Sequence, residues 1–180
     1  WRTTYNQTLA TAMAEEEWDY ITIQQASPKS GQANSMGNLD NALNWIDDNK
    51  TNPNAKILWH MTWAYQQNIA GSRTTNFKNY FNNSQAIMYN AIVDATAKYI
   101  VGPKAQYGAE FDGWLPVGAA VQNLRATMGD NITRDGFHMS LQAGRLVAAM
   151  TVLKTLYPEV DLNKITPDAV KPFLVTNKTD

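Results

Sequence analysis

The sequence predicts an α/β domain in which helices cover a parallel β-sheet. Three observations support this class. Segments with helical spacing of apolar residues alternate with short β-favouring runs, and polar loops of variable length separate them. In addition, 44% of the 180 residues are hydrophobic, which is enough for the core of a layered domain. We therefore expect one domain over residues 1–180.

The first half of the chain predicts two helices and two strands. Apolar periodicity favours a helix over residues 5–17, and "WDYITIQQ" at 18–25 predicts a strand centred on β-favouring residues. The stretch "ASPKSGQANSMGN" is rich in Ser, Gly and Asn and predicts a loop, and "LDNALNWIDDNK" predicts a helix that "TNPN" ends. The run "KILWHMTW" at 56–63 predicts the second strand.

The second half continues the alternation. The expected elements, in order, are a polar loop over 64–76, a long helix over 84–100, a short strand within 110–118, a helix over 119–128, and a final helix over 141–157. The sequence "VGPK" after residue 100 ends the long helix, and Ser140 is placed to cap the last one.

Composition excludes several classes of protein. The net charge is −1 without a run of like charge, so no nucleic-acid partner is expected. No apolar stretch approaches the ~20 residues of a membrane span. The chain has no cysteine and two histidines far apart, so no metal site is expected, and no glycine-rich loop predicts a phosphate-bearing cofactor.

The segment "TRDGFHMS" carries the clearest chemical signal. It places Asp135 three residues before His138, ahead of the last predicted helix. A carboxylate in that position can hold Nδ1–H of the imidazole and leave Nε2 to accept a proton from a serine hydroxyl. The alternative is a loop pair with structural meaning alone. Gly136 and Phe137 favour the catalytic interpretation, because they allow a tight turn that is anchored from below.

Other candidates lie at the predicted carboxyl ends of the strands, where α/β proteins collect function. Gln24 and Gln25 follow the first strand and could donate a side-chain N–H to an oxyanion. Trp63 could bind substrate, and the aromatic residues that could stack on sugars or instead fill the core are Trp59, Trp63, Tyr65 and Trp114. His60 lies among aromatics in a strand and is expected to be a structural residue outside the catalytic set.

Four segments in this order resemble the SGNH (GDSL-type) hydrolases: "WDYITIQQAS", "HMTWAYQQN", "LPVGAAVQNLR" and "GDNITRDGFHMSLQAGR". More narrowly, they are similar to a subgroup known as a domain of unknown function in exported bacterial proteins. The resemblance implies a flavodoxin-like α/β/α sandwich of about five parallel strands and a Ser-His-Asp triad. Asp135 and His138 match its D-x-x-H block, and Gln25, with Gln24 as the alternative, would replace the usual asparagine of the oxyanion hole.

The chain departs from this pattern because the Gly-Asp-Ser or Gly-Asn-Ser block after the first strand of the family is absent. The expectation is that these residues are the C-terminal portion of a longer hydrolase and that the nucleophile lies upstream of Trp1. In the family's strand order the missing strand would leave one edge and one face of the strand at 20–23 exposed. The rival interpretation is an internal nucleophile, for which Ser27 is the best placed.

The resemblance implies an exported serine esterase, secreted, periplasmic or at the cell surface, that removes acetyl-like groups from a small-molecule or carbohydrate ester without a cofactor. Its expected partner is the N-terminal segment of the same protein. Two alternatives remain open: a carbohydrate-binding protein that lost its nucleophile, and an acyltransferase that uses the same triad.

Overall fold

The computed structural model describes residues 8–166 and 168. The described residues form a three-stranded parallel sheet in the order β1-β2-β3. The strands are β1 (Tyr20–Ile23), β2 (Lys56–His60) and β3 (Gly113–Leu115). The predicted α/β class with a parallel sheet is therefore confirmed, and all three strands fall within the predicted runs.

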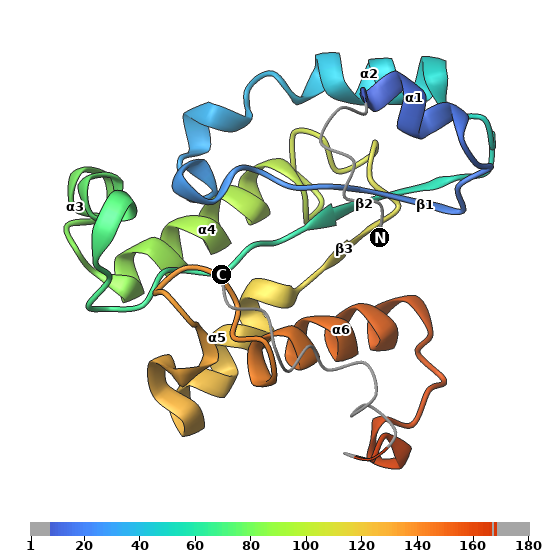
Figure 1. Ribbon diagram of the computed structural model, residues 1–180. Coiled ribbons are helices and arrows are strands. Elements are labelled where there is room, and N and C mark those ends of the chain that lie inside the picture. The colour runs from blue at the N-terminus through green and yellow to red at the C-terminus, as the bar shows by residue number, and fades with distance from the viewer. Residues whose placement is uncertain (1–7, 167, 169–180) are drawn as a thin grey trace.

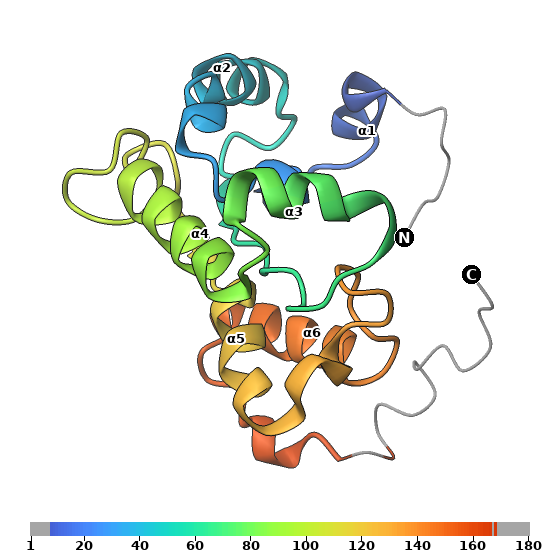
Figure 2. The same cartoon turned by 90° about the vertical axis from the view of Figure 1, so that its left-hand side faces the viewer.

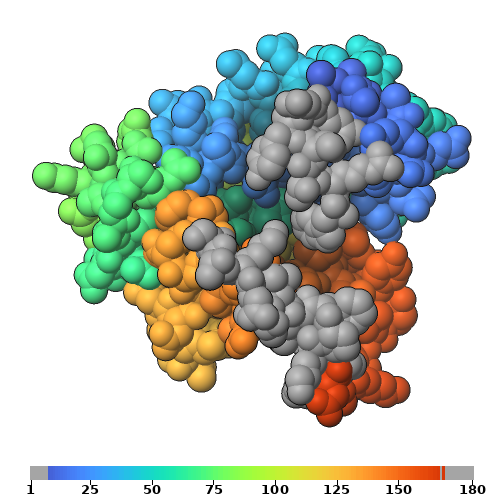
Figure 3. All heavy atoms as spheres, viewed as in Figure 1, coloured from blue at the N-terminus to red at the C-terminus, as the bar shows by residue number. Residues whose placement is uncertain are grey.

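Helices cover both faces of this sheet, which gives three layers (Figure 1). One face packs against α1 (Leu9–Ala14), α2 (Leu39–Asn49), α3 (Thr74–Phe81) and α4 (Gln85–Tyr99). The other face packs against α5 (Val117–Met128) and α6 (Ala143–Leu156). Figure 2 shows α3 beside α4 at one end of the first layer, with α5 and α6 in the opposite layer. In Figure 3 the first layer appears in blue, cyan and green, and the opposite layer appears in orange.

Alternation along each strand divides the core into two clusters, because successive side chains point to opposite faces. On β2, Ile57 and Trp59 belong to the cluster under α2 and α4, whereas Leu58 packs with Leu115 under α5 and α6. Trp59 is only 2% exposed. By the same alternation, Gln24 and Gln25, which follow β1, are expected to point toward different layers.

The strand β1 pairs with β2 and is an edge strand within the described part of the chain. Its burial is incomplete: Thr22 is exposed, and Tyr20, Ile21 and Ile23 are half-buried. A parallel strand is normally covered on both faces and paired on both sides. Within the described residues, β1 therefore has one unpaired edge and is covered only in part.

Serine hydroxyls mark the starts of α4 and α6. The hydroxyl of Ser84 caps α4 by accepting the backbone N–H of Ile87 at 3.3 Å. For α6, Gln142 occupies the cap position, and the hydroxyl of Ser140 accepts the N–H of Gly144 at 2.9 Å in the first turn. The observed α1 is shorter than the helix predicted over 5–17, and the predicted start at Tyr5 lies outside the described residues.

The helix α3 was not predicted, because its sequence "TTNFKNYF" is rich in residues of low helix propensity. Its formation is explained by packing. Phe77 and Phe81 stand four residues apart, share one side of the helix, and are 1% and 2% exposed in the core. The helix ends at Asn82, which adopts the left-handed conformation with φ 52°.

Candidate functional site

The loop that carries Asp135 and His138 is closed by backbone hydrogen bonds at its base. Thr133 and Met139 form an antiparallel bridge, and the N–H of Arg134 donates to the carbonyl of His138 at 3.1 Å. The N–H of Ser140 donates to the carbonyl of Ile132 at 2.9 Å. Since Ile132, Thr133 and Met139 are buried, the loop rises from a fixed base at the start of α6.

Within this loop, the two side chains meet as the sequence predicts. Nδ1 of His138 lies 2.5 Å from Oδ2 of Asp135. The other carboxylate oxygen, Oδ1, accepts the backbone N–H groups of His138 at 2.7 Å and of Phe137 at 3.1 Å. One carboxylate therefore fixes both the loop backbone and the orientation of the imidazole ring.

The electrostatics favour an ionised Asp135. Burial raises the pKa of this carboxyl, but the hydrogen bonds from the His138 side chain and from the two backbone N–H groups lower it more, so that the pKa lies below its ordinary value. An ionised carboxylate can accept Nδ1–H and leave Nε2 unprotonated. The His138 side chain is 52% exposed, so the imidazole is open to solvent.

The tip of the loop is docked on the segment that follows β2. The carbonyl of Gly136 accepts the N–H of Gln66 at 2.8 Å, and the hydroxyl of Thr133 donates to Oε1 of Gln66 at 3.0 Å. Gly136 has φ +93°, and a Cβ atom there would lie 2.8 Å from Cγ1 of Ile69. A glycine is thus required between Asp135 and His138 on both conformational and steric grounds.

Aromatic side chains from the β2 side hold the same loop. The indole N–H of Trp63 donates to the carbonyl of Phe137 at 2.7 Å. The Phe137 ring is half-buried, lies 5.9 Å from the ring of Tyr65, and has the guanidinium of Arg73 over it at 5.2 Å. The expected anchoring through Phe137 is therefore observed, and Trp63 is joined to the residue directly before His138.

Two of the other aromatic residues considered for stacking on a sugar are too buried to contact one. Trp59 and Tyr65 are 2% and 0% exposed and fill the core. Trp114 is half-buried and packs against the same core cluster.

The two glutamines after β1 have different surroundings. The amide nitrogen of Gln25 donates to the carbonyl oxygen of Ser35 at 3.0 Å and to its hydroxyl at 3.2 Å, and its Oε1 accepts the N–H of Ala26. The amide nitrogen of Gln25 is thus engaged with Ser35. Oε1 of Gln24 lies 2.7 Å from Nδ1 of His60, which leaves its amide nitrogen available. Of the two candidates named from the sequence, Gln25 thus has its amide nitrogen bound to Ser35, and Gln24 has its amide nitrogen without a partner among the described residues.

His60 is at the carboxyl end of β2 and half-buried, and burial lowers its pKa. Its ring meets the ring of Trp63 edge-on, with 6.4 Å between the centroids and an interplanar angle of 82°. Sequence reasoning placed His60 outside the site. Its position opposite Gln24 depends on the register of β1 and β2, which the sequence does not reveal.

Ser27, the internal nucleophile considered from the sequence, is directed toward a tyrosine. Its hydroxyl lies 3.0 Å from the hydroxyl of Tyr65. Burial raises the pKa of Tyr65, although the Ser27 hydrogen bond and the charge of Arg73 oppose this shift. Within the described part of the chain, neither histidine forms a hydrogen bond with Ser27. The arrangement does not resemble a serine activated by a histidine base.

Arg125 supports the start of the loop, a role that the sequence does not indicate. Its side chain is 8% exposed, and Nη2 donates to the carbonyl of Ala64 at 2.8 Å, while Nε lies 3.3 Å from Oδ1 of Asp130. Asp130 in turn accepts the backbone N–H of Gln67. The guanidinium is therefore used to join α5, the segment after β2 and the approach to the loop.

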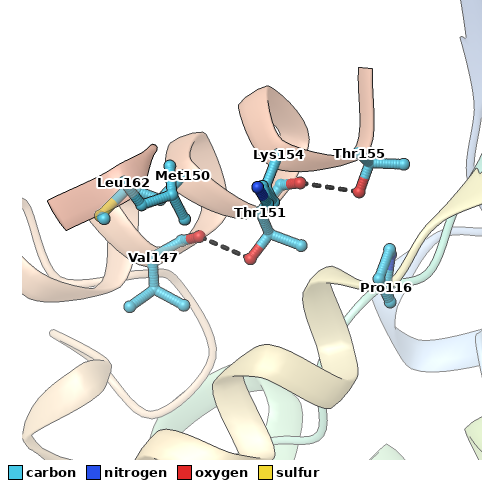
Figure 4. A pocket seen from close by; sticks show the side chains of 7 residues that line it. All are labelled: Pro116, Val147, Met150, Thr151, Lys154, Thr155 and Leu162. Carbon is cyan, nitrogen blue, oxygen red and sulfur yellow. Dashed lines mark hydrogen bonds between the residues drawn. The ribbon is translucent and has the colours of Figure 1, made fainter. Parts of the chain in front are cut away.

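A separate hollow of about 400 Å³ lies between α6 and Pro116, and its lining is apolar (Figure 4). The hydroxyls of Thr151 and Thr155 turn back to the carbonyls of Val147 and Thr151 within the helix. Neither histidine nor either glutamine of the candidate site lines it.

No group of three or more His, Cys, Asp or Glu side chains that could hold a metal ion occurs among residues 8–166 and 168. None of the helices in those ranges is long and apolar enough to cross a membrane.

Comparison with known proteins places these features in a family. Residues 1–177 match the family described as "Domain of unknown function (DUF4886)". A crystal structure of a DUF4886 family protein from Bacteroides uniformis ATCC 8492 is 36% identical with a TM-score of 0.77; the match covers 92% of this chain and 61% of that one. The 180 residues thus span 61% of the length of that relative.

A second solved structure is similar in fold. It is a protein from Slackia heliotrinireducens described as a "putative SGNH hydrolase", with 20% identity, a TM-score of 0.52, and coverage of 81% of this chain and 69% of that one. The comparison with curated proteins gave no match. The match over nearly the whole length and the 36% identity together show that the chain belongs to the DUF4886 family.

Proposed function

We propose that this chain carries the acid–base part of an SGNH-type serine esterase that removes small acyl groups, such as acetyl, from a carbohydrate. The observation that supports the proposal is the Asp135–His138 pair, with 2.5 Å between carboxylate and imidazole and an imidazole side chain that is half exposed. The α/β fold and its similarity to the Slackia heliotrinireducens protein support the reaction class.

In the proposed reaction, a serine hydroxyl attacks the ester carbonyl and Nε2 of His138 accepts the serine proton. The bond between the acyl carbon and the alkoxy oxygen then breaks, and His138 returns the proton to the leaving alcohol. Water attacks the resulting acyl-serine, again with His138 as base. The acid leaves and the serine regains its proton. Asp135 holds the imidazole and stabilises its protonated form throughout.

The oxyanion of each tetrahedral intermediate needs donors. Gln24 is the side-chain candidate, because its amide nitrogen is uncommitted whereas that of Gln25 is bound to Ser35. A donor of this kind contributes about 10²–10³ in rate.

The proposal takes the nucleophile to be a serine that precedes these 180 residues in the full-length protein. Two observations support this. Ser27 is paired with Tyr65 rather than with a histidine, and the DUF4886 relative is longer than this chain. Trp63, whose half-buried ring lies between the two histidine-bearing segments, is the candidate to bind the sugar.

A fluorophosphonate probe, which labels activated serines, tests the proposal. In the full-length protein we expect labelling of one serine upstream of Trp1, and loss of labelling in His138→Ala. Gln142→Ala, an exposed change in the same region, is the control and should be labelled normally. Labelling that persists in His138→Ala, or labelling of Ser27, would contradict the assignment.

Product analysis separates the hydrolase from the acyltransferase. With an acetylated oligosaccharide as substrate, a hydrolase releases free acetate in proportion to the deacetylated sugar. Transfer of the acetyl group to a second sugar without release of acetate would favour the acyltransferase instead.

A further inference from the structure

We propose that His60 is a positioning residue that holds Gln24 as the side-chain donor of the oxyanion hole. The inference rests on the proposed function and adds to it a histidine outside the Asp135–His138 pair. Three features support it: the strand register, the direction of one hydrogen bond, and the different surroundings of the neighbouring glutamine.

The register of the sheet brings the two residues together. Ile23 pairs with Trp59 across β1 and β2, so Gln24, directly after β1, lies beside His60, the last residue of β2. Side chains alternate between the two faces of a strand. Gln24 therefore shares the face of Tyr20 and Leu58, toward α5 and α6, and Gln25 turns to the opposite face.

The hydrogen bond between them has a defined direction. Oε1 of Gln24 has no hydrogen, so Nδ1 of His60, 2.7 Å away, is the donor. The neutral imidazole then carries its hydrogen on Nδ1, and burial favours this neutral form by lowering the pKa of His60. The amide plane of Gln24 is fixed from its oxygen side, which directs the NH₂ group away from His60.

That NH₂ group is free to bind a substrate oxygen. Gln24 is exposed, and no group in the described part of the chain accepts a hydrogen bond from its amide nitrogen. An exposed glutamine would otherwise sample many rotamers, and a donor is effective only where its orientation is set before the reaction. His60 supplies that orientation.

Gln25 provides the internal comparison. Its amide is also held by hydrogen bonds. In Gln25, however, the amide nitrogen is the atom that is bound, because it donates to Ser35. Of two adjacent glutamines, one thus presents a fixed and unused donor and the other does not.

A series of contacts through Trp63 connects His60 with the loop of His138, the proposed general base. Its ring meets Trp63 edge-on, and the indole N–H of Trp63 donates to the carbonyl of Phe137, the neighbour of His138. Gln24, His60, Trp63 and the His138 loop therefore form one continuous set across the carboxyl ends of β1 and β2.

A double-mutant cycle in the full-length protein tests the inference, with hydrolysis of p-nitrophenyl acetate as the assay. We expect kcat/KM to fall about 10²–10³-fold in Gln24→Ala and at least about tenfold in His60→Leu. His60→Asn, whose side-chain N–H can replace Nδ1–H, should recover most of the loss seen in His60→Leu. In the Gln24→Ala background, His60→Leu should cause no further fall, because its effect passes through Gln24.

An undiminished effect of His60→Leu in the Gln24→Ala background would overturn the inference while leaving the proposed function intact. Hydrolysis that is insensitive to His138→Ala would overturn the proposed function and this inference with it. A readout independent of activity is the ¹⁵N NMR spectrum of the imidazole, assigned with His60→Asn. It should show hydrogen on Nδ1 of His60, and hydrogen on Nε2 alone would overturn the inference whatever the kinetics.

Discussion

The carboxylate of Asp135 binds His138 twice: Oδ2 lies 2.5 Å from Nδ1 of the imidazole, and Oδ1 accepts the backbone N–H of the same residue at 2.7 Å. The two bonds have different roles. The bond to the backbone shapes the loop, and the bond to the ring selects the tautomer with a free Nε2. A substitution that keeps one oxygen and replaces the other can therefore separate structure from catalysis.

Asp135→Asn should leave the fold intact and reduce kcat about 10³–10⁴-fold, the size of effect that a wrong histidine tautomer produces in a triad. The remaining Oδ1 can still accept the two backbone N–H groups, while the new Nδ2 donor faces Nδ1 of His138. Esterase kinetics and a thermal melt of the full-length protein are the measurements.

Asp135→Ala is the matched control, because it removes both bonds and should lower the melting temperature as well as kcat. Equal losses of thermal stability in the Asn and Ala variants would show that Oδ1 does not hold the loop, contrary to its hydrogen bonds with the two backbone N–H groups.

Trp63→Phe should weaken catalysis more than stability. The change keeps an aromatic ring but removes the N–H that donates to the carbonyl of Phe137 at 2.7 Å. Loss of one such bond costs about 1 kcal/mol of unfolding free energy. The fall in kcat should be at least about tenfold, because small displacements of a catalytic group are costly.

The control for this prediction is Trp45→Phe, which also shortens a half-buried tryptophan, but on α2. Urea unfolding and esterase kinetics compare the two variants. A fall in kcat of the same size in both would contradict a specific role for Trp63.

Much of the fold could be predicted because local signals and packing agree. The periodic segment that became α4 begins and ends within one residue of the predicted range, and Ser84 caps it as residue type suggests. The exception is α3, where Phe77 and Phe81 gain more by entering the core than the Thr and Asn residues lose in helix propensity. That balance depends on long-range contacts, which a short window of sequence does not contain.

The part of the candidate site that consists of residues close together in the sequence could be predicted. Asp135 and His138 are three residues apart, so their contact follows from one loop. The pairing of Gln24 with His60 links residues 36 positions apart and requires the register of two strands. The hydrogen bonds of the Gln25 amide to Ser35 likewise join residues ten positions apart across a loop, which a local pattern does not reveal.

Gly136→Ala should destabilise the protein more than Gly71→Ala. Both residues have a positive φ, +93° and +81°, which costs an alanine about 1–2 kcal/mol. At Gly71 no atom lies within 4 Å of the position that the alanine methyl group would take, whereas at Gly136 that methyl would lie 2.8 Å from Ile69 and 3.1 Å from Gln66. Overpacking of this kind adds about 1–3 kcal/mol.

The free energy of unfolding of both glycine variants in urea measures the difference, and esterase kinetics should show loss of activity in Gly136→Ala alone. Equal destabilisation by the two changes would mean that the loop can shift away from Ile69 and Gln66 without cost.

The lowered pKa of His60 predicts a pH dependence of stability. Its ordinary pKa is 6.5, and burial brings the folded value below this. The unfolded chain therefore binds the proton first as pH falls, so the contribution of His60 to stability is complete above about pH 6.5 and is lost as pH falls through the folded pKa. For one proton the slope cannot exceed about 1.4 kcal/mol per pH unit.

His60→Asn removes this titration and should flatten the profile of unfolding free energy below pH 6.5, with little change at pH 8. Asp135 affects stability only at lower pH. Its pKa in the folded protein lies below the ordinary 3.8, so its contribution to the unfolding free energy is lost only as pH falls below that value. Urea unfolding of both proteins at several values between pH 5 and 8 is the measurement, and the difference between the two profiles isolates His60. Parallel profiles for wild type and His60→Asn would show that His60 has the same pKa in the folded and unfolded states, which would contradict the lowering expected from its burial.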